Sequence, residues 1–301
     1  MNLQQILETF TIERDGRVIA VPCGYIVLGF KDFEACRLPL IEVFDKMCAR
    51  MGEHVRHYVT HSMRQYKRVD KTFESLFRGW FGDPYRVPDG GGEYGLEAHS
   101  GDDPQATGSW GVKFNVEPWS LDFEAGTLAF EVPLELAFDG GLEAIAREIA
   151  ETLPLRSACA GLSLARNGRY PTLHDKEMAA WNMRYHGLLP NSPIGARYAL
   201  HEGALTPAWI TMLDAELSAA CGPTARLGDD VTAETIGELT FLRAGDAPTL
   251  ADAHADRSEV APYQALHRFL DPVVFSEAEH LYFEGFDDEM LERWISRFED
   301  A

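Results

Sequence analysis

Hydrophobic runs and the alternation of hydrophobic with polar positions predict β-strands along the chain. The strongest run lies within residues 18–30, where Pro22 indicates the start of a strand or an edge position, because proline cannot donate a ladder hydrogen bond. Residues 127–136 alternate clearly, and the neighbouring run 112–117 therefore predicts an antiparallel hairpin. Further strands are predicted at 57–69, 159–165, 196–201 and 236–243.

Hydrophobic positions spaced by three and four residues predict amphipathic helices between these strands. Leu40, Phe44, Met47 and Met51 share one face of a first helix, and Pro39 is expected in its first turn, where a missing N–H costs nothing. The last helix begins after its cap Asp287 and carries its apolar positions along one side. Other helices are predicted at 72–81, 140–153, 206–222 and 259–270.

Two segments rich in glycine, proline and asparagine interrupt this pattern. Residues 88–111 are expected to form a long loop, which in a compact domain is either mobile or a binding element. Residues 166–193 are expected to be irregular and to mark a boundary between lobes. We therefore predict an α+β fold with antiparallel or mixed sheets and packed helices. It is divided into an N-terminal lobe, 1–165, and a C-terminal lobe, 166–301, that form a pseudo-repeat, or else it is one continuous domain.

Charge narrows the classes of partner. The net charge is −21, with about +2 in residues 1–88 and about −23 in the remainder. Such a field repels nucleic acid and anionic membranes and steers a basic partner, although acidity also serves solubility alone. No apolar run reaches the roughly 20 residues of a membrane-spanning helix, and the N-terminus resembles no signal peptide. The five cysteines form no CxxC pair. Together these features predict a cytoplasmic protein with free thiols, no nucleic-acid partner and no membrane partner.

The best metal candidate is the histidine group His54, His57 and His61. On a helix, His57 and His61 would share a face and could bind zinc together with a carboxylate. In a strand they would lie about 13 Å apart, too far for one ion. No HExxH, phosphate-binding glycine motif or G-x-S-x-G motif is present, so we predict no catalytic residue, no metal and no cofactor. A metal-dependent hydrolase that uses these histidines is kept as an alternative.

Acidic residues interleaved with aromatic residues are typical of a protein-binding surface, with aromatic anchors in the centre and charges at the rim. Two acidic clusters occur: one flanks the predicted strand 236–243, and the other, which alone is interleaved with aromatic residues, lies before and at the start of the last helix. The alternative is that the aromatics pack beneath that helix and the acids only solvate it. The residues assigned to the partner-binding surface are Asp229, Asp230, Glu234, Glu279, Tyr282, Phe283, Glu284, Phe286, Asp287, Asp288 and Glu289.

The most distinctive segment is 206–275. It runs from a predicted helix with Trp209 to a stop at Gly222, then through a strand to the loop of Gly245 and Pro248 and a helix with Tyr263. Leu213, Ala244, Asp252 and Pro272 complete the pattern. This order resembles the type VI secretion immunity proteins (TsiV-like), formerly a domain of unknown function.

Two positions depart from that family pattern: Pro223 and Ala251 stand where the family has glycines. The resemblance implies a non-enzymatic protein that binds and neutralises a cognate toxin, encoded adjacently, in the cytoplasm of the producing cell. It implies no cofactor. A homodimer, or a non-enzymatic oligomeric scaffold without a toxin partner, is kept as an alternative.

Overall fold

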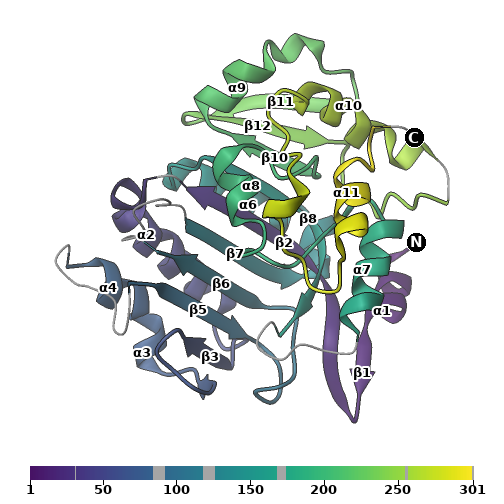
Figure 1. The fold of residues 1–301 in the computed structure, drawn as a ribbon. Helices are drawn as coiled ribbons and strands as arrows, with labels where there is room; N and C mark the ends of the chain where they lie inside the picture. The colour runs from purple at the N-terminus through teal and green to yellow at the C-terminus, as the bar shows by residue number, and fades with distance from the viewer. Residues whose placement is uncertain (31, 84–91, 118–125, 168–173, 255–256, 300–301) are drawn as a thin grey trace.

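A single 12-stranded sheet runs through the computed structural model, which describes all residues except 31, 84–91, 118–125, 168–173, 255–256 and 300–301 (Figure 1). The strand order is β11-β12-β10-β8-β2-β7-β6-β5-β3-β4, with β1 on β2 and β9 on β8. Between the described strands, all pairings are antiparallel except that of β8 with β9. The strands are β1 Ile12–Arg14, β2 Arg17–Phe30, β3 His57–Thr60, β4 Lys67–Arg68, β5 Tyr94–His99, β6 Gly111–Val116, β7 Gly126–Pro133, β8 Ser157–Arg166, β9 Leu188–Leu189, β10 Ile210–Leu213, β11 Val231–Ile236 and β12 Leu239–Ala244.

The helices pack on both faces of this sheet, and the α+β class predicted from the sequence is confirmed. The α-helices are α1 Leu3–Phe10, α2 Phe33–Met51, α3 Lys71–Glu74, α4 Leu76–Phe81, α5 Leu134–Phe138, α6 Gly141–Thr152, α7 Asp175–Arg184, α8 Arg197–Glu202, α9 Ala215–Cys221, α10 Ala261–Leu270 and α11 Asp288–Ile295. The short 3-10 turns among the described residues are η1 Thr224–Arg226, η2 Arg257–Glu259 and η3 Ala278–His280.

Strand β2 is the spine of the sheet. It pairs with β8 over ten residues and with β7 over eight, so it is hydrogen-bonded on both sides through most of its length. Pro22 lies between the part of β2 that pairs with β1 and the part that pairs with β7, where a missing N–H breaks no ladder on that side. The predicted β6–β7 hairpin is confirmed, with Phe114 opposite Leu128.

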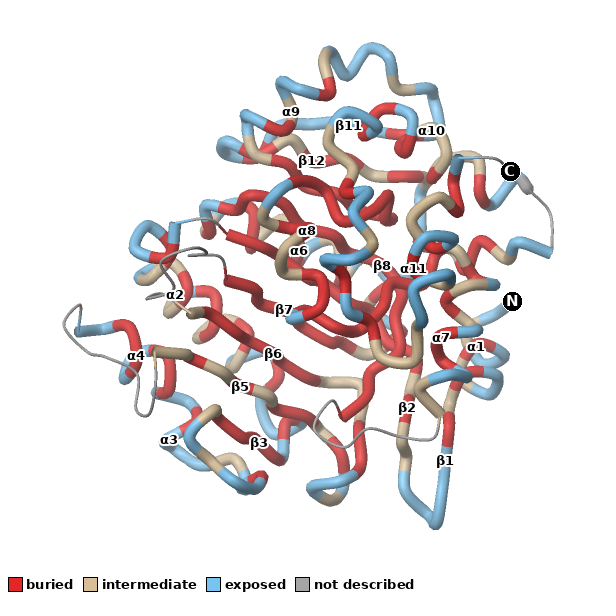
Figure 2. Tube along the Cα trace, viewed as in Figure 1, coloured by how far each residue is buried: buried red, intermediate tan, exposed pale blue. Residues whose placement is uncertain are grey.

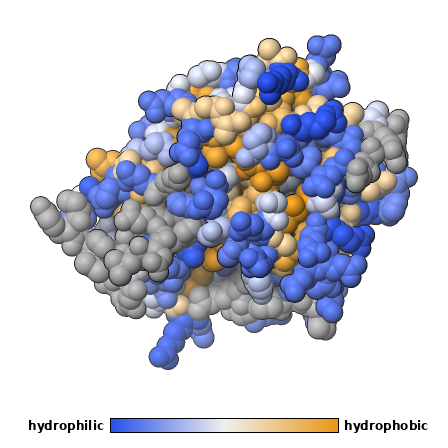
Figure 3. Space-filling view, turned by 45° about the horizontal axis from the view of Figure 1, so that its top comes forward, coloured by the Kyte–Doolittle hydropathy of each residue, from blue (hydrophilic) through white to orange (hydrophobic). Residues whose placement is uncertain are grey.

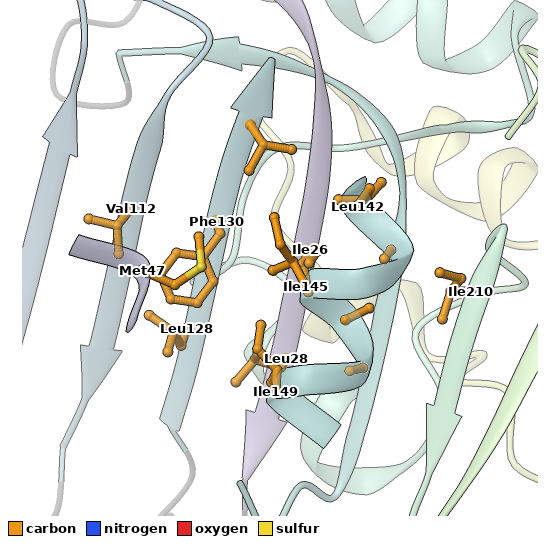
Figure 4. Close-up of a cluster of buried hydrophobic side chains, with 14 of the residues drawn as sticks. Ile26, Leu28, Met47, Val112, Leu128, Phe130, Leu142, Ile145, Ile149 and Ile210 are labelled. Carbon is orange, nitrogen blue, oxygen red and sulfur yellow. The ribbon is translucent and has the colours of Figure 1, made fainter. Parts of the chain in front are cut away.

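One face of the sheet, here called the helix-rich face, is covered by α2, α4 and α6. Figure 4 shows Ile26 and Leu28 of β2 beside Ile145 and Ile149 of α6, and Figure 2 shows the strands buried along this layer. These side chains belong to the largest hydrophobic cluster of the described residues. The regular spacing of their helices explains why this layer was predictable from sequence.

The first helix differs from its prediction at its start. Helix α2 begins at Phe33, because the Asp32 side chain accepts a hydrogen bond from the backbone N–H of Ala35 at 2.9 Å. Pro39 therefore lies inside the helix and not in its first turn. Packing of Phe44 and its neighbours against β2, β6 and α4 holds the helix through the proline.

The opposite face, here called the C-terminal face, is covered in part by the C-terminal elements. Tyr25, Val27 and Cys159 of β2 and β8 form a second cluster with Leu200 of α8 and Trp294 of α11. In Figure 1 these helices lie in front of β2 and β8, whereas no described helix lies over β5 and β6. The C-terminal face therefore has a covered part, on β2 and β8, and an open part, on β3, β5 and β6.

The predicted tryptophan helix at 206–222 is wrong in its first half. Residues 210–213 form strand β10 between β8 and β12, and helix α9 starts only after its cap Asp214. Residues four apart, such as Trp209 and Leu213, share one face of a strand as well as of a helix, so the spacing did not discriminate. The β-branched pair Ile210 and Thr211 favours the strand.

Three further predictions are corrected. The strand expected at 196–201 is helix α8, consistent with its alanines and leucine, and it was one element of the suggested repeat. The segment 166–193 contains helix α7, and the loop expected at 88–111 contains strand β5, paired on both sides. Long-range pairing overrode the local glycine content there. Residues 88–91 of that loop lie outside the described residues.

The division into lobes at 165/166 and the pseudo-repeat stay predictions. Strand β8 ends at Arg166, and β10 from the second half pairs directly with it, so one sheet carries strands from both predicted lobes.

Candidate partner-binding surface

The segment 277–289 connects 3-10 turn η3 to helix α11 and carries most of the predicted binding residues. The side chain of Asp287 caps the helix by accepting a hydrogen bond from the Met290 backbone N–H at 2.9 Å, as the sequence predicted. Asp288 and Glu289 lie in the first turn, where carboxylates interact favourably with the helix dipole. These three side chains and that of Glu279 are exposed.

The three aromatic residues of this segment have different environments. Phe283 is buried and packs edge-on against Trp294 of α11, with ring centroids 5.2 Å apart. Phe286 is half-buried and contacts Phe283. Tyr282 alone points outward, with 69% of its surface exposed. Phe283 and Phe286 thus fit the expectation that the aromatics pack beneath the last helix, whereas Tyr282 is exposed enough to contact a partner.

A second exposed apolar residue stands beside Tyr282. Ile194, 60% exposed, lies in a loop whose backbone touches that of Tyr282: the Tyr282 N–H donates to the Gly195 carbonyl at 3.3 Å. The Ser192 hydroxyl donates to the Tyr282 carbonyl at 3.2 Å. Any Cβ at Gly195 would lie 1.6 Å from that carbonyl, so only glycine permits this approach. We call Ile194 and Tyr282 the apolar lip.

Ile194 was missed by sequence reasoning. The sequence feature that could have drawn attention to it is that a large aliphatic residue stands alone between Pro193 and Gly195, in a segment without the period of a strand or a helix.

On the face of the molecule drawn in Figure 3, hydrophilic residues predominate, and hydrophobic residues reach the surface near the middle.

Buried ionic contacts hold the two loops of the lip on the sheet. Asn191 accepts from the Lys113 ammonium at 2.7 Å and donates to Glu131 at 2.7 Å and to the Leu164 carbonyl at 3.0 Å. Lys113 and Glu131 form an ion pair at 2.8 Å, and both are nearly inaccessible. The loop of Ile194 is therefore fixed to β6 and β7 by fully bonded groups.

The loop of Tyr282 is held in the same way from β8. Arg166, at the end of that strand, forms ion pairs with Glu284 and with Asp175 of α7, the latter at 3.3 Å. Its side chain is only 6% exposed. Glu284, predicted as a partner contact, thus has a structural ion pair as well as partial exposure.

Beside the lip, the open part of the C-terminal face contains a groove of about 260 Å³. Strands β3, β5 and β6 form its floor, and the loop of Ile194 together with Glu284 forms one wall. The groove lies between the lip and the polar residues of the open strands.

The other acidic cluster lies elsewhere. Asp229, Asp230 and Glu234 are exposed in and before the edge strand β11. Glu234 forms an ion pair at 2.5 Å with Arg147 of α6, which belongs to the helix-rich face. The structure therefore does not join this cluster to the lip.

The histidines of the alternative hypothesis are bound in separate contacts. His54 stacks on Trp110, with centroids 5.5 Å apart, and a ring nitrogen of His57 lies 3.2 Å from the Gly101 carbonyl. His61 accepts from the Gly95 backbone N–H at 3.3 Å. Among the described residues, no three His, Cys, Asp or Glu side chains are grouped so that they could hold a metal ion. Burial lowers the pKa of His57 below its ordinary value.

Comparison with known proteins identifies the chain. The TsiV family, described as type VI immunity for VRR-NUC, matches residues 40–298. The chain belongs to the TsiV family. It is thus a type VI immunity protein against a VRR-NUC toxin, which makes it an inhibitor and not an enzyme.

The structure of another protein that has been solved has a similar fold. The Pseudomonas aeruginosa T6SS protein PA0821 superposes with a TM-score of 0.79 at 18% sequence identity, over 98% of this chain and 89% of that chain. At this identity the likeness shows the fold. No curated protein sequence is detectably similar to this TsiV-family chain. Over the described part of the chain, the helices are too short or too polar to cross a membrane.

Proposed function

We propose that this TsiV-family protein neutralises its VRR-NUC toxin by direct binding through the apolar lip and the carboxylates around it. The observation that carries the proposal is the exposed pair Ile194 and Tyr282, set on two loops that are hydrogen-bonded to each other and clamped to the sheet. Exposed large apolar side chains on rigid supports are the usual anchors of protein interfaces. Asp287, Asp288, Glu289 and Glu279 provide an acidic rim.

The negative net charge of the protein also favours a nuclease as its partner. The name VRR-NUC denotes a nuclease, and a nuclease binds phosphates with lysine and arginine side chains, so its nucleic-acid surface is basic. A protein of net charge −21 attracts such a surface over a distance of about one Debye length and speeds encounter. Apolar anchoring and electrostatic steering therefore act on the same complex.

We also propose where in the cell the protein acts and which gene encodes its toxin. The protein acts in the cytoplasm of the cell that produces the toxin, and the toxin is encoded by the adjacent gene. A homodimer through the lip is the competing use of this surface. Light scattering of the free protein separates the two, because a monomer leaves the lip available to the toxin.

The decisive experiment uses a matched pair of exposed aliphatic residues. Ile194 and Leu38 are each 60% exposed, but Leu38 lies on α2, on the helix-rich side. We expect Ile194→Ala to weaken toxin binding by about 2 kcal/mol, roughly 30-fold, and Leu38→Ala to leave it unchanged. Titration calorimetry with the cognate toxin measures both variants. Equal affinities for the two would refute the lip, and no binding by the wild type would refute direct neutralisation.

A further inference from the structure

The groove beside the lip has cations that are already neutralised. Lys113 is paired with Glu131 at 2.8 Å, and Arg166 is paired with Asp175 at 3.3 Å and with Glu284. These lysine and arginine side chains are buried, so they cannot swing out to meet an anion. The groove therefore offers little attraction to a phosphate or to a carboxylate of a partner.

Its carboxylates outnumber those cations. The residues that line or directly back the groove bring three cations, Lys113, Arg166 and Arg197, against six carboxylates, those of Glu93, Glu97, Glu117, Glu131, Asp175 and Glu284. An enclosed surface with an excess of one charge concentrates its field in the cleft. The complementary ligand is a cation.

Glu93 is the carboxylate best placed to receive it. The side-chain amide of Asn115 donates to Glu93, and the oxygen of that amide accepts from Arg197 at 3.0 Å, which fixes the orientation of the amide. Within the described ranges, no lysine, arginine or histidine forms an ion pair with Glu93. Its side chain is half-buried, and the residue directly precedes β5. A half-buried carboxylate with a single neutral donor has remaining acceptor capacity.

We infer that the groove receives an arginine side chain of the cognate VRR-NUC toxin, while the apolar lip packs on the surface around that arginine. This inference rests on the proposed function. The groove volume, about 260 Å³, falls below the range of pockets that hold drug-sized molecules and suits one long side chain. The apolar stem of an arginine packs against Val59 and Ile194, and its guanidinium reaches Glu93.

Arginine fits this groove better than lysine for two reasons. The guanidinium is planar and binds a carboxylate through two parallel hydrogen bonds, and it is more weakly hydrated than an ammonium, so it enters a half-buried groove at lower cost. The groove is also continuous with the lip, because Ile194 lines both. One partner surface can therefore reach both features in one binding event.

The test compares two substitutions that remove the same charge. Glu93→Gln keeps an oxygen for the Asn115 amide, whereas Glu151→Gln changes an exposed glutamate on α6, on the other face of the sheet. We expect Glu93→Gln to weaken binding of the cognate toxin by at least about tenfold, and Glu151→Gln to have less than about a twofold effect. Calorimetry gives the affinities, and thermal unfolding checks that both variants fold like the wild type.

Replacement of the toxin's surface arginines and lysines by glutamine, one at a time, identifies the occupant. One such replacement should weaken binding to the wild type but have no added effect with Glu93→Gln. The inference is overturned if the two glutamate variants bind equally well, if no arginine couples to Glu93, or if a lysine couples instead. Loss of affinity in Ile194→Ala without any effect of Glu93→Gln would reject the groove and leave the proposed function intact. A wild-type protein that fails to bind the toxin would reject both.

Discussion

The covered and the open parts of the C-terminal face belong to the same sheet but have opposite chemistry. On the covered part, Tyr25 and Val27 of β2 are buried beneath the C-terminal helices. On the open part, the residues that occupy the equivalent side of β5 and β6 are Glu97, Lys113 and Asn115, and no described helix lies over them. A continuous sheet thus carries apolar side chains beneath the C-terminal helices at one end and polar, largely buried side chains along the groove at the other.

The boundary between the two parts is where the apolar lip and the groove meet. Glu131 lies on β7 between them and, with Lys113, fixes the loop of Ile194. Arg166 does the same for the loop of Tyr282. The C-terminal segment therefore does two things: it completes the core over β2 and β8, and its outer edge supplies Tyr282, which forms the lip together with Ile194 of another loop.

The largest expected effect separates these two roles. Trp294 is fully buried on the covered part, and Trp294→Ala should lower the free energy of unfolding by about 4 kcal/mol, because it leaves a large cavity beneath α11. Tyr282→Ala on the outer edge should change it by less than about 0.5 kcal/mol. Urea denaturation measures both. Similar losses would mean that the lip, too, is part of the core.

The second effect concerns acid stability in the open strands. Burial lowers the pKa of His99 on β5 to about 4, so this imidazole is neutral in the folded protein. The unfolded chain, with a histidine pKa of about 6.5, binds the proton first. The stabilisation is therefore complete above about pH 6.5 and is lost as pH falls towards 4, by about 3 kcal/mol from this residue.

Denaturation across pH 4.5–7 tests this sign, in a range set by the two pKa values of His99. The dependence should flatten in His99→Gln and remain in His54→Gln, where the histidine is exposed. A His99→Gln variant with the full dependence would assign the acid sensitivity to other histidines, such as the half-buried His186, whose pKa desolvation also lowers to about 4.

The third effect probes the clamp between the two parts. Asn191→Ala removes the hydrogen bonds to Lys113 and Glu131 and should cost about 2 kcal/mol of stability. It should also weaken toxin binding, although Asn191 is buried, because the loop of Ile194 must then be ordered on binding. Calorimetry and hydrogen exchange of residues 192–195 test this. Unchanged affinity with faster exchange would show that rigidity of the lip does not matter.

The smallest effect is electrostatic. Charge reversal at Asp287, Asp288 and Glu289 should slow association with the toxin several-fold at low salt and leave dissociation nearly unchanged. Stopped-flow kinetics at two salt concentrations measures it, with Asp229 and Asp230 reversed as the control on β11's side. An equal slowing in the control would point to net charge and not to the rim.

Local sequence patterns predicted many of the strands and helices correctly. The spine strand, the β6–β7 hairpin, α6, α10 and the cap of α11 at Asp287 all follow from period and capping signals. The errors at 206–213 and 94–99 arose where long-range strand pairing decides the structure. At 196–201 the error was of the opposite kind, because the predicted strand is helix α8. For the candidate site, Tyr282 was predicted and stands exposed, Phe283 is buried, and Ile194 was missed.

The sequence by itself determined the element types wherever hydrophobic period and caps agree, the strongly acidic charge, and the resemblance to type VI immunity proteins. Those signals are local or additive, so they can be read without the fold. Only the tertiary structure decided which polar residues meet. Ser192 and Tyr282 are 90 positions apart, and Lys113 and Asn191 are 78 apart. No local pattern records such contacts, because they depend on the sheet order that brings β6, β7 and β8 beneath the two loops of the lip.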